Sequence, residues 1–402
     1  MNIGIFTNNY LPNPYGVTGS IESFRKQLEK LGHTVYIFAP KYKNYTDENS
    51  RACPKQYPAE RDFGRVFRYP SIDFKYKISF PLAIPFSKKM DKIISGLDLD
   101  IIHSQHPNLL GSAAQKWAKK KNIPLCFTWH TLYDQYTHFI PLIPEKISGA
   151  WAIKNATKYA NRSDAVIIPT ESIRSIIQNW GVTNKNIFAI PTGVEEEFYQ
   201  NPDRNIVRNK FGIKDNEILL LLVSRLTEEK NVEFLFRSII KVLETNPTTK
   251  LLVSGDGYLL PRLKSLVTEN NLNDRIFFEG IVKKEELKNY YSAGDIFVYA
   301  SKSETQGMIV SEAMYCGLPI VAVASTGIES LVENNQNGFL VSESEEDFSQ
   351  AVQKLIDNPE LRKNFAEKSA QIAQEKYTSA ICAKHMLEIY EKVINNKKNG
   401  LF

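Results

Sequence analysis

The sequence of 402 residues has few cysteines and no long apolar run. Its four cysteines, Cys53, Cys126, Cys316 and Cys382, include no C-x-x-C pair, so neither a disulfide framework nor a structural zinc site is expected. The longest apolar run, Ile218–Val223, is much shorter than the roughly 18 residues that cross a bilayer. The chain starts directly with a strand pattern and shows no basic and long apolar segments of a signal peptide. These absences favour a reducing, cytoplasmic compartment.

Charge is spread unevenly along the chain. Residues 1–190 hold 25 Lys and Arg against 14 Asp and Glu, a net charge of +11, whereas residues 191–402 hold 25 against 31, a net charge of −6. A basic half suggests an anionic partner, although charge can also drift between domains by chance. The apolar (43%) and charged (24%) fractions are those of a folded globular protein, and at roughly 150 residues per domain the length predicts about two or three domains.

Short apolar runs alternate with amphipathic segments from one end of the chain to the other. One amphipathic pattern begins at Ser20 and places Ile21, Phe24 and Leu28 on one face, with Gly32 positioned to end a helix. Such alternation predicts a parallel sheet covered by helices on both faces, which is an α/β fold. Strands are expected at residues 3–7, 34–38, 100–103, 125–128 and 165–169, and again at 218–223, 250–254, 276–279, 296–300 and 320–323.

The repeated pattern predicts two doubly wound domains. We expect an N-terminal domain at residues 1–195, a second domain at 205–377, and a final helix at about 378–396 that could pack back onto the first. The join is expected in the acidic and polar segment 191–209. Doubly wound domains bind ligands beyond the carboxyl ends of their strands. Two of them facing each other would form a cleft that takes one ligand from each side, as in many enzymes.

Charged residues gather at predicted strand ends in the second half. Arg225 ends one strand and Lys230 starts the following helix, so two cations and a helix N-terminus could flank a phosphate. The alternative is a solvated arginine beside its neighbouring glutamates. Glu304 follows another strand, and Glu312 lies two turns into the next helix. A carboxylate there can accept two hydrogen bonds from a ribose diol, and free amides at residues 307–309 can hold a diphosphate.

Two loops with glycine follow predicted strands. The loop at residues 8–20 contains Gly16, which would let backbone amides approach a ligand at a helix N-terminus. This loop is neither a Walker A loop nor G-x-G-x-x-G, which argues against nucleoside-triphosphate hydrolysis and dinucleotide redox chemistry. Gly255 lies in a strand-to-helix turn that we expect to be tight and close to a ligand.

Histidines follow two predicted strands of the first half. His130 comes directly after a strand, so its imidazole is expected to form hydrogen bonds at the carboxyl end of the sheet. The alternative is a metal set with Asp134 and His138, which share one helix face with His130 if the segment is helical. For His103 and His106 we expect structural roles.

Taken together, these segments resemble the retaining GT-B glycosyltransferases of glycosyltransferase family 4, over nearly the whole chain. The most specific matches are residues 224–231, 254–257, 278–280, 303–307 and 312–314. The N-terminal half is similar, more narrowly, to the bacterial 1,2-diacylglycerol 3-glucosyltransferases. The segments that carry this second likeness are residues 69–71, 103–107, 128–133, 169–171 and 191–193.

The resemblance implies a GT-B fold, two Rossmann-like domains that face each other across a cleft, and two groups of site residues. The catalytic group would be His130, Arg225, Lys230 and Glu304. The donor-binding group would be Gly16, Gly255, Ile281, Gly307, Met308, Ile309 and Glu312. In these roles the cations would neutralise the departing diphosphate, so that no metal ion or other cofactor is expected.

The expected reaction moves a hexose, most simply glucose, from a UDP-sugar to a membrane lipid such as diacylglycerol. The basic half suits an anionic membrane, since each basic group near such a surface contributes on the order of 1 kcal/mol. We therefore expect peripheral attachment to the inner face of the cell membrane and no nucleic-acid partner. The residues expected at the acceptor entrance and the membrane are Tyr133, Tyr136, Phe139, Lys116, Lys119 and Lys120.

Three other functions remain open on the sequence alone. The first is another reaction on the same architecture, either a mannosyl- or other hexosyltransferase that acts on a phosphoinositol or glycan acceptor, or a sugar-nucleotide epimerase. The second is a transferase with a soluble acceptor, whose basic surface has no partner. The third is a protein that binds a nucleotide sugar without turning it over.

Overall fold

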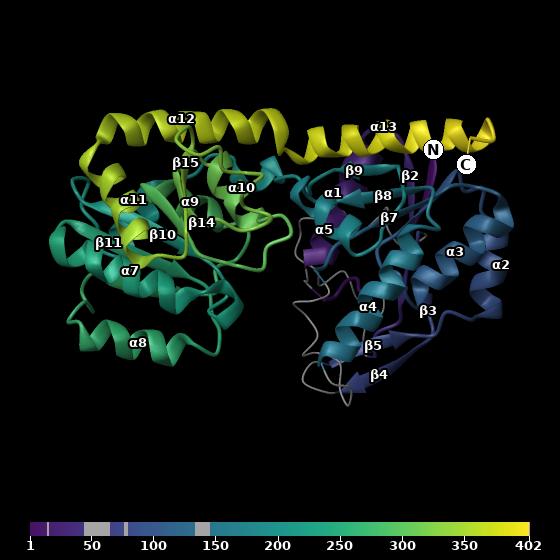
Figure 1. Ribbon diagram of the computed structural model, residues 1–402, viewed down its shortest axis with the longest axis horizontal. Coiled ribbons are helices and arrows are strands. Elements are labelled where there is room, and N and C mark those ends of the chain that lie inside the picture. The colour runs from purple at the N-terminus through teal and green to yellow at the C-terminus, as the bar shows by residue number, and fades with distance from the viewer. Residues whose placement is uncertain (14–15, 44–64, 76–78, 133–144, 402) are drawn as a thin grey trace. The chain divides into compact units, whose positions relative to one another are not determined.

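A computed structural model describes residues 1–13, 16–43, 65–75, 79–132 and 145–401. The chain divides into a first unit, formed by Met1–Thr192 with Cys382–Phe402, and a second unit, formed by Gly193–Ile381. Each unit is built on its own parallel sheet (Figure 1). The predicted α/β class with two Rossmann-like domains is therefore confirmed.

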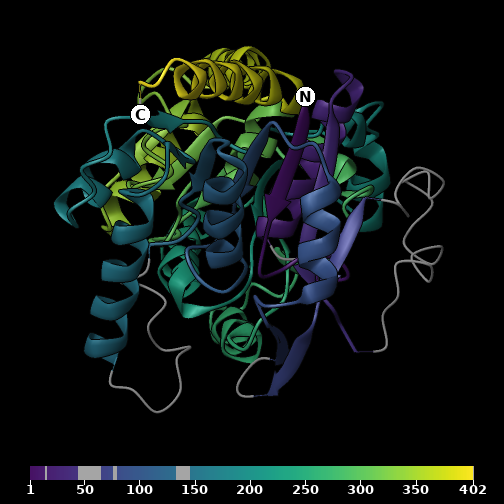
Figure 2. The same cartoon turned by 90° about the vertical axis from the view of Figure 1, so that its right-hand side faces the viewer.

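The first unit has a seven-stranded sheet with the strand order β3-β2-β1-β6-β7-β8-β9, in which every pair of neighbours is parallel. The strands are β1 (Asn2–Phe6), β2 (Thr34–Pro40), β3 (Val66–Tyr69), β6 (Ile101–Ser104), β7 (Leu125–Thr128), β8 (Ala165–Ile168) and β9 (Ile187–Ala189). The helices are α1 (Gly16–Lys30), α2 (Lys88–Gly96), α3 (Leu110–Lys121), α4 (Glu145–Ala160) and α5 (Ser172–Asn179). A separate antiparallel hairpin joins β4 (Ser71–Lys75) and β5 (Ser79–Ala83) (Figure 2).

Apolar side chains cover both faces of this sheet. Successive strand residues point to opposite faces, and Ile101 and Ile167 accordingly belong to one buried cluster while Ile102 and Ile168 belong to another. Burial on both faces is why these strands read as continuous apolar runs in the sequence rather than as alternating patterns.

The last helix, α13 (Ser379–Lys398), packs on one face of the first unit (Figure 1). Its residues Met386 and Tyr390 lie in the same buried cluster as β1, and Lys397 forms an ion pair of 2.9 Å with Asp164. The Tyr390 hydroxyl lies 2.5 Å from Nδ1 of His103. These contacts tie the C-terminal segment to the N-terminal sheet.

The second unit repeats this construction with the strand order β12-β11-β10-β13-β14-β15. The strands are β10 (Ile218–Val223), β11 (Thr249–Ser254), β12 (Ile276–Gly280), β13 (Ile296–Tyr299), β14 (Ile320–Val323) and β15 (Gly338–Val341). The α-helices are α6 (Arg204–Lys210), α7 (Val232–Thr245), α8 (Leu260–Glu269), α9 (Leu287–Ala293), α10 (Met308–Tyr315), α11 (Glu345–Asp357) and α12 (Pro359–Lys376). The short 3₁₀ helices η4 (Glu196–Tyr199) and η5 (Glu228–Lys230) precede α6 and α7.

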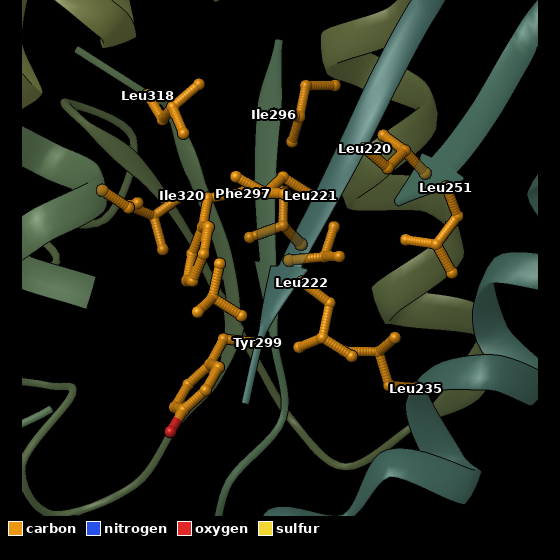
Figure 3. Close-up of a cluster of buried hydrophobic side chains, with 14 of the residues drawn as sticks. Leu220, Leu221, Leu222, Leu235, Leu251, Ile296, Phe297, Tyr299, Leu318 and Ile320 are labelled. Carbon is orange, nitrogen blue, oxygen red and sulfur yellow. The ribbon is translucent and has the colours of Figure 1, made fainter. Parts of the chain in front are cut away.

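The core of the second unit lies on its central strands. Figure 3 shows leucines of β10 beside Ile296 and Phe297 of β13, with Tyr299 at one end of the cluster. The strand order reverses between β10 and β13, which is the position where sheets of this kind bind ligands beyond their carboxyl ends. The apolar core therefore holds the ends of these two strands, and the loops that follow them, in place.

Every strand expected from the sequence is present, but β3, β9, β15 and the hairpin were not expected. The unexpected strands β3, β9 and β15 all lie at sheet edges, and each has three or four residues. An edge strand has a neighbour on one side only and is less buried, so its sequence lacks the continuous apolar run on which the prediction relied.

His103 makes the stability of the first unit depend on pH. Burial lowers the pKa of His103 from 6.5 to about 3, and its two ring nitrogens lie 2.5 Å from the Tyr390 hydroxyl and 2.6 Å from the Thr128 hydroxyl. In the unfolded chain His103 binds a proton near pH 6.5, whereas in the folded protein it stays neutral down to about pH 3. Stability should therefore fall as pH drops below 6.5, by about 1.4 kcal/mol per pH unit for this residue.

Urea unfolding of the full chain between pH 7.5 and 5.5 measures this dependence. His103→Gln should destabilise the protein at every pH and should reduce the slope by about a third, because burial also lowers the pKa values of His106 and His130 in the same unit. His385→Gln, which changes an exposed histidine of the same unit, should leave both unchanged. A slope that His103→Gln leaves intact would show that other groups cause the dependence.

Candidate functional site

A largely buried ion pair joins two loops of the second unit. Lys230 Nζ, from the loop after β10, forms an ion pair with Oε1 of Glu304, from the loop after β13, and only 11% and 14% of the two side chains are exposed. The backbone N–H of Lys302 also donates to the Glu229 carbonyl at 3.3 Å. Two residues predicted from separate sequence motifs are thus brought into contact at the point where the strand order reverses.

The Glu304 carboxylate is held by three donors on one oxygen. Besides Lys230, the hydroxyl of Tyr299 donates to Oε1 at 2.7 Å and the hydroxyl of Ser301 at 2.9 Å. Burial alone would raise the pKa of Glu304, but the charge of Lys230 and the hydrogen bonds outweigh it and lower the pKa. Glu304 is therefore an ionised carboxylate near neutral pH.

Arg225 takes the arrangement that the sequence left as an alternative. Its side chain is 62% exposed and pairs at 3.1 Å with Glu229, four residues further along the chain. Burial is the main effect that raises the pKa of Tyr299, and the charge of Arg225 acts against it. The guanidinium is therefore close enough to affect the Tyr299–Glu304 pair electrostatically, but in this structure it is solvated and not joined to Lys230.

Lys230 precedes the helix that it was expected to start. It ends the short 3₁₀ helix η5, and α7 begins at Val232. Asn231 separates the two with a left-handed conformation (φ 54°), a conformation that asparagine tolerates better than most residues. The turn directs the lysine to Glu304 rather than into a regular helix.

Gly255 allows two loops to pack backbone against backbone. A Cβ atom at this position would lie 1.7 Å from the carbonyl oxygen of Ser224, and its φ of +140° also favours glycine. At Gly257 a Cβ atom would lie 2.2 Å from the carbonyl of Leu226. The tight turn predicted here is present, and contact with the loop after β10 is sufficient to account for both glycines.

The helix α10 starts at the same edge of the sheet. Gly307 precedes it with a φ of +79°, and the N–H groups of Val310 and Ser311 donate to its carbonyl. Among the residues that the structure describes, the N–H groups of Met308 and Ile309 have no acceptor, as is usual in a first helical turn. These two amides are therefore available to an anion, as the sequence suggested.

Glu312 lies one turn further into α10, beside a group of tyrosines. The hydroxyl of Tyr291 donates to Glu312 Oε2 at 3.0 Å. Burial raises the pKa of Glu312, while the charge of Lys284 and the hydrogen bond from Tyr291 act against this rise. Lys284 in turn forms an ion pair with Glu195.

Three buried hydroxyls in these loops have no hydrogen-bond partner among the described residues. They are Thr227 Oγ1 after β10, Ser303 Oγ after β13 and Ser325 Oγ after β14. An unpaired buried hydroxyl costs about 1–3 kcal/mol, so these groups are suited to a polar ligand at this edge. Sequence reasoning missed them, because isolated serines and threonines in loops carry no pattern.

Ile281 lies on the loop that follows β12, at the edge of the same sheet, and its side chain is 82% exposed. Because no described residue covers this large apolar side chain, it is open to a stacking contact with a ligand.

In the first unit, His130 follows β7 as predicted. Its Nε2 lies 2.6 Å from Oε1 of Gln105, so Nε2 is the atom that carries the proton and Nδ1 is left as an acceptor. Burial, with smaller effects of His106 and His103, lowers the pKa of His130 to about 3, which keeps the ring neutral. Gln105 was not expected to have this role.

The other expected residues of the first unit are placed as follows. Gly16 begins α1 and is exposed, and a Cβ atom there would touch nothing within 4 Å. Lys116 pairs with Asp91 at 3.2 Å, Lys120 lies 4.5 Å from the ring centroid of Trp117, and Lys119 is exposed. Five residues lie outside the described part of the chain, namely Tyr133, Asp134, Tyr136, His138 and Phe139.

Groups of three or more metal-binding side chains are absent from the described residues. The alternative metal set with His130 includes two residues outside that part of the chain, so it is not tested.

Sequence families cover most of the chain. The family described as Glycosyltransferase Family 4 matches residues 14–198, and the family described as Glycosyl transferases group 1 matches residues 203–372. The alpha-monoglucosyldiacylglycerol synthase of Streptococcus pneumoniae is 32% identical, over 98% of this chain and 87% of its own length. The synthase of the same name from Acholeplasma laidlawii is 29% identical over 99% of both chains.

Relatives with another donor and solved structures also match. A GDP-mannose-dependent alpha-mannosyltransferase of Mycobacterium tuberculosis is 27% identical over 89% of this chain and 88% of its own. The crystal structure of Anabaena HepE in complex with UDP superposes with a TM-score of 0.77 over 98% of this chain and 100% of that chain, at 18% identity, which shows a shared fold.

The family resemblance predicted from the motifs is confirmed by the two family matches and by the 32% identity over nearly the whole chain. The chain therefore belongs to glycosyltransferase family 4 and is a hexosyltransferase with the GT-B fold.

Proposed function

We propose that this enzyme transfers glucose from UDP-glucose to diacylglycerol, with retention of the anomeric configuration. The observation that carries the donor half of the proposal is the Lys230–Glu304 pair, set beside the free amides of α10 at the edge where β10 and β13 end. The acceptor is inferred from the likeness to two alpha-monoglucosyldiacylglycerol synthases.

The site residues have distinct roles in this proposal. Lys230, Arg225 and the amides of Met308 and Ile309 stabilise the diphosphate as it leaves, which is an electrostatic contribution that needs no proton transfer. Glu304 accepts hydrogen bonds from the sugar, and Glu312 accepts them from the ribose. His130, neutral and with Nδ1 free to accept, binds a hydroxyl of the donor sugar.

The chemical step forms a bond between an acceptor hydroxyl oxygen and the anomeric carbon while the bond from that carbon to the phosphate oxygen breaks. The hydroxyl proton passes to the departing diphosphate on the same face of the sugar. Such a step needs no protein base, which agrees with the assigned roles: none of the residues is a nucleophile or an acid–base catalyst.

A donor panel tests the substrate assignment. UDP-glucose, UDP-galactose, UDP-N-acetylglucosamine and GDP-mannose are each offered with diacylglycerol in anionic micelles, and the glycolipid is measured by mass spectrometry. We expect the highest kcat/KM with UDP-glucose, and the same rate with and without EDTA because Lys230 supplies positive charge. A preference for GDP-mannose, or loss of activity in EDTA, would overturn that part of the proposal.

Lys230→Ala should lower kcat by about 100-fold or more, since removal of one group that stabilises transition-state charge typically has this effect. The matched control is Lys302→Ala, which removes a lysine from an exposed ion pair with Glu343 in a neighbouring loop and should leave kcat within about twofold. Circular dichroism shows whether each variant is folded. Equal activity of the two variants would exclude Lys230 from the catalytic group.

Because the proposed acceptor is a lipid, the same proposal requires the first unit to bind an anionic membrane. No helix in the described part of the chain is both long enough and apolar enough to cross a bilayer. On α4, Trp151 is 60% exposed, and the exposed Lys154 and Lys158 follow at three and seven residues, on the same helix face. Residues 146–163 contain no acidic side chain. Tryptophan and lysine in this arrangement suit a lipid interface.

This face is a better candidate than the lysines of α3, of which Lys116 is already paired with an aspartate. Both views place the beginning of α4 and the hairpin β4–β5, which carries the exposed Ile72, at the same end of the first unit (Figures 1 and 2).

Flotation with liposomes tests the attachment. The double variant Lys154→Glu, Lys158→Glu should weaken recovery with anionic vesicles by about tenfold or more, since each basic group contributes on the order of 1 kcal/mol. The control reverses two exposed lysines of the second unit, Lys264→Glu and Lys363→Glu, and should float like the wild type. Equal recovery of the wild type with neutral and anionic vesicles would contradict the electrostatic attachment.

A further inference from the structure

We propose that Tyr299 is a positioning residue, which together with Ser301 fixes the orientation of the Glu304 carboxylate so that one oxygen is fully occupied and the other is presented to the donor sugar. This inference rests on the proposed function, in which Glu304 binds the sugar, and adds the residues that set the geometry of that contact. Tyr299 lies outside the segments that carry the family resemblance, and the nearest of these is residues 303–307.

The hydrogen bonds on Glu304 are divided unequally between its two oxygens. Oε1 accepts from Lys230, from the Tyr299 hydroxyl at 2.7 Å and from the Ser301 hydroxyl at 2.9 Å. No described residue donates to Oε2. A carboxylate has about four lone-pair sites over its two oxygens, so three donors exhaust Oε1 and leave the acceptor capacity of the group on Oε2.

Tyr299 is held rigidly enough to impose this orientation. It is the last residue of β13, it is opposite Ala322 in the register with β14, and only 2% of it is exposed. Its ring stacks on Phe297 with 6.0 Å between centroids and 24° between planes. Figure 3 shows the ring at the end of the leucine cluster with its oxygen pointing away from the cluster.

Ser301 acts from the same short segment. It is fully buried, and its hydroxyl lies 3.4 Å from the carbonyl of Glu229 as well as 2.9 Å from Glu304. The strand end thus contributes two hydroxyls at residues 299 and 301, which is the spacing of side chains on one side of an extended chain. The carboxylate is bound to the sheet through them and not only through the flexible lysine.

A purely structural role predicts a different result from a positioning role. Phenylalanine fills the same space as tyrosine and would remove a hydroxyl from an apolar strand, so Tyr299→Phe should leave the fold intact. Without the hydroxyl, the carboxylate can rotate about its terminal bond and share its oxygens between Lys230 and the sugar. The sugar contact should then weaken, whereas contacts to the diphosphate and the base should not.

Kinetics and binding of the full chain test this proposal. Tyr299→Phe should lower kcat/KM with the best donor of the panel by about tenfold, the usual effect of one hydrogen bond to a charged group. The inhibition constant of UDP, which has no sugar, should stay within about twofold of the wild-type value. The loss of a hydrogen bond to the carboxylate also raises the pKa of Glu304, so the acid limb of the kcat/KM profile should move to higher pH.

The control is Tyr290→Phe, which removes a tyrosine hydroxyl that donates at 2.8 Å to another carboxylate of the second unit, Glu279. It should change none of the three measurements. Wild-type kinetics in Tyr299→Phe, or equal weakening of UDP and UDP-glucose, would overturn the positioning role.

Calorimetry separates this outcome from failure of the proposed function. If the wild type turns over no donor of the panel, the proposed function fails. The positioning role is then tested by the affinities of UDP-glucose and UDP alone, whose ratio Tyr299→Phe should reduce by about tenfold. An unchanged ratio would overturn the positioning role as well.

Discussion

The largely buried ion pair of Lys230 and Glu304 is the interaction on which the donor half of the molecule depends. Taking two charges out of water costs more than their attraction returns, unless further hydrogen bonds satisfy them. Here the strand end supplies these bonds through Tyr299 and Ser301. The pair joins the loops after β10 and β13, which are neighbours only because the strand order reverses between them. The strand order thus brings Lys230 and Glu304 together, and their ion pair holds the loops after β10 and β13 against each other.

Much of the fold could be predicted from the sequence because its strands are buried on both faces. A run such as Ile218–Val223 can be stable in water only inside a covered sheet, and two series of such runs imply two sheets. The missed strands β3, β9 and β15 lie at sheet edges, where burial is partial. Helix starts were also displaced: Lys230 precedes α7 instead of opening it, because Asn231 takes a left-handed turn that no apolar pattern reveals.

The site was predictable only as far as charge marks it. A lysine and a glutamate after two strands stand out because a charge at the end of a buried strand needs a partner, and the structure joins these two. Tyr299 and Tyr291, by contrast, look like ordinary core residues, since their rings are buried and only their hydroxyls reach the carboxylates. Arg225 was predicted beside Lys230, but its position depends on a competition with Glu229 that sequence spacing does not resolve.

Glu304 and Glu312, the two site carboxylates of the second unit, differ in their electrostatics. Burial raises the pKa of Glu312, whereas the pKa of Glu304 is lowered. Glu304 is surrounded by donors, its pKa is lowered, and its charge is settled before any ligand arrives. Around it lie groups that are not yet satisfied: the amides of α10 and the hydroxyls of Thr227, Ser303 and Ser325. Oε1 of Glu304 is fully occupied, whereas Oε2, the amides of α10 and the three hydroxyls have no partner among the described residues. The amides and hydroxyls gain hydrogen bonds when a ligand rich in anionic acceptors binds. The free energy that these unpaired groups cost in the ligand-free protein is then recovered as binding free energy.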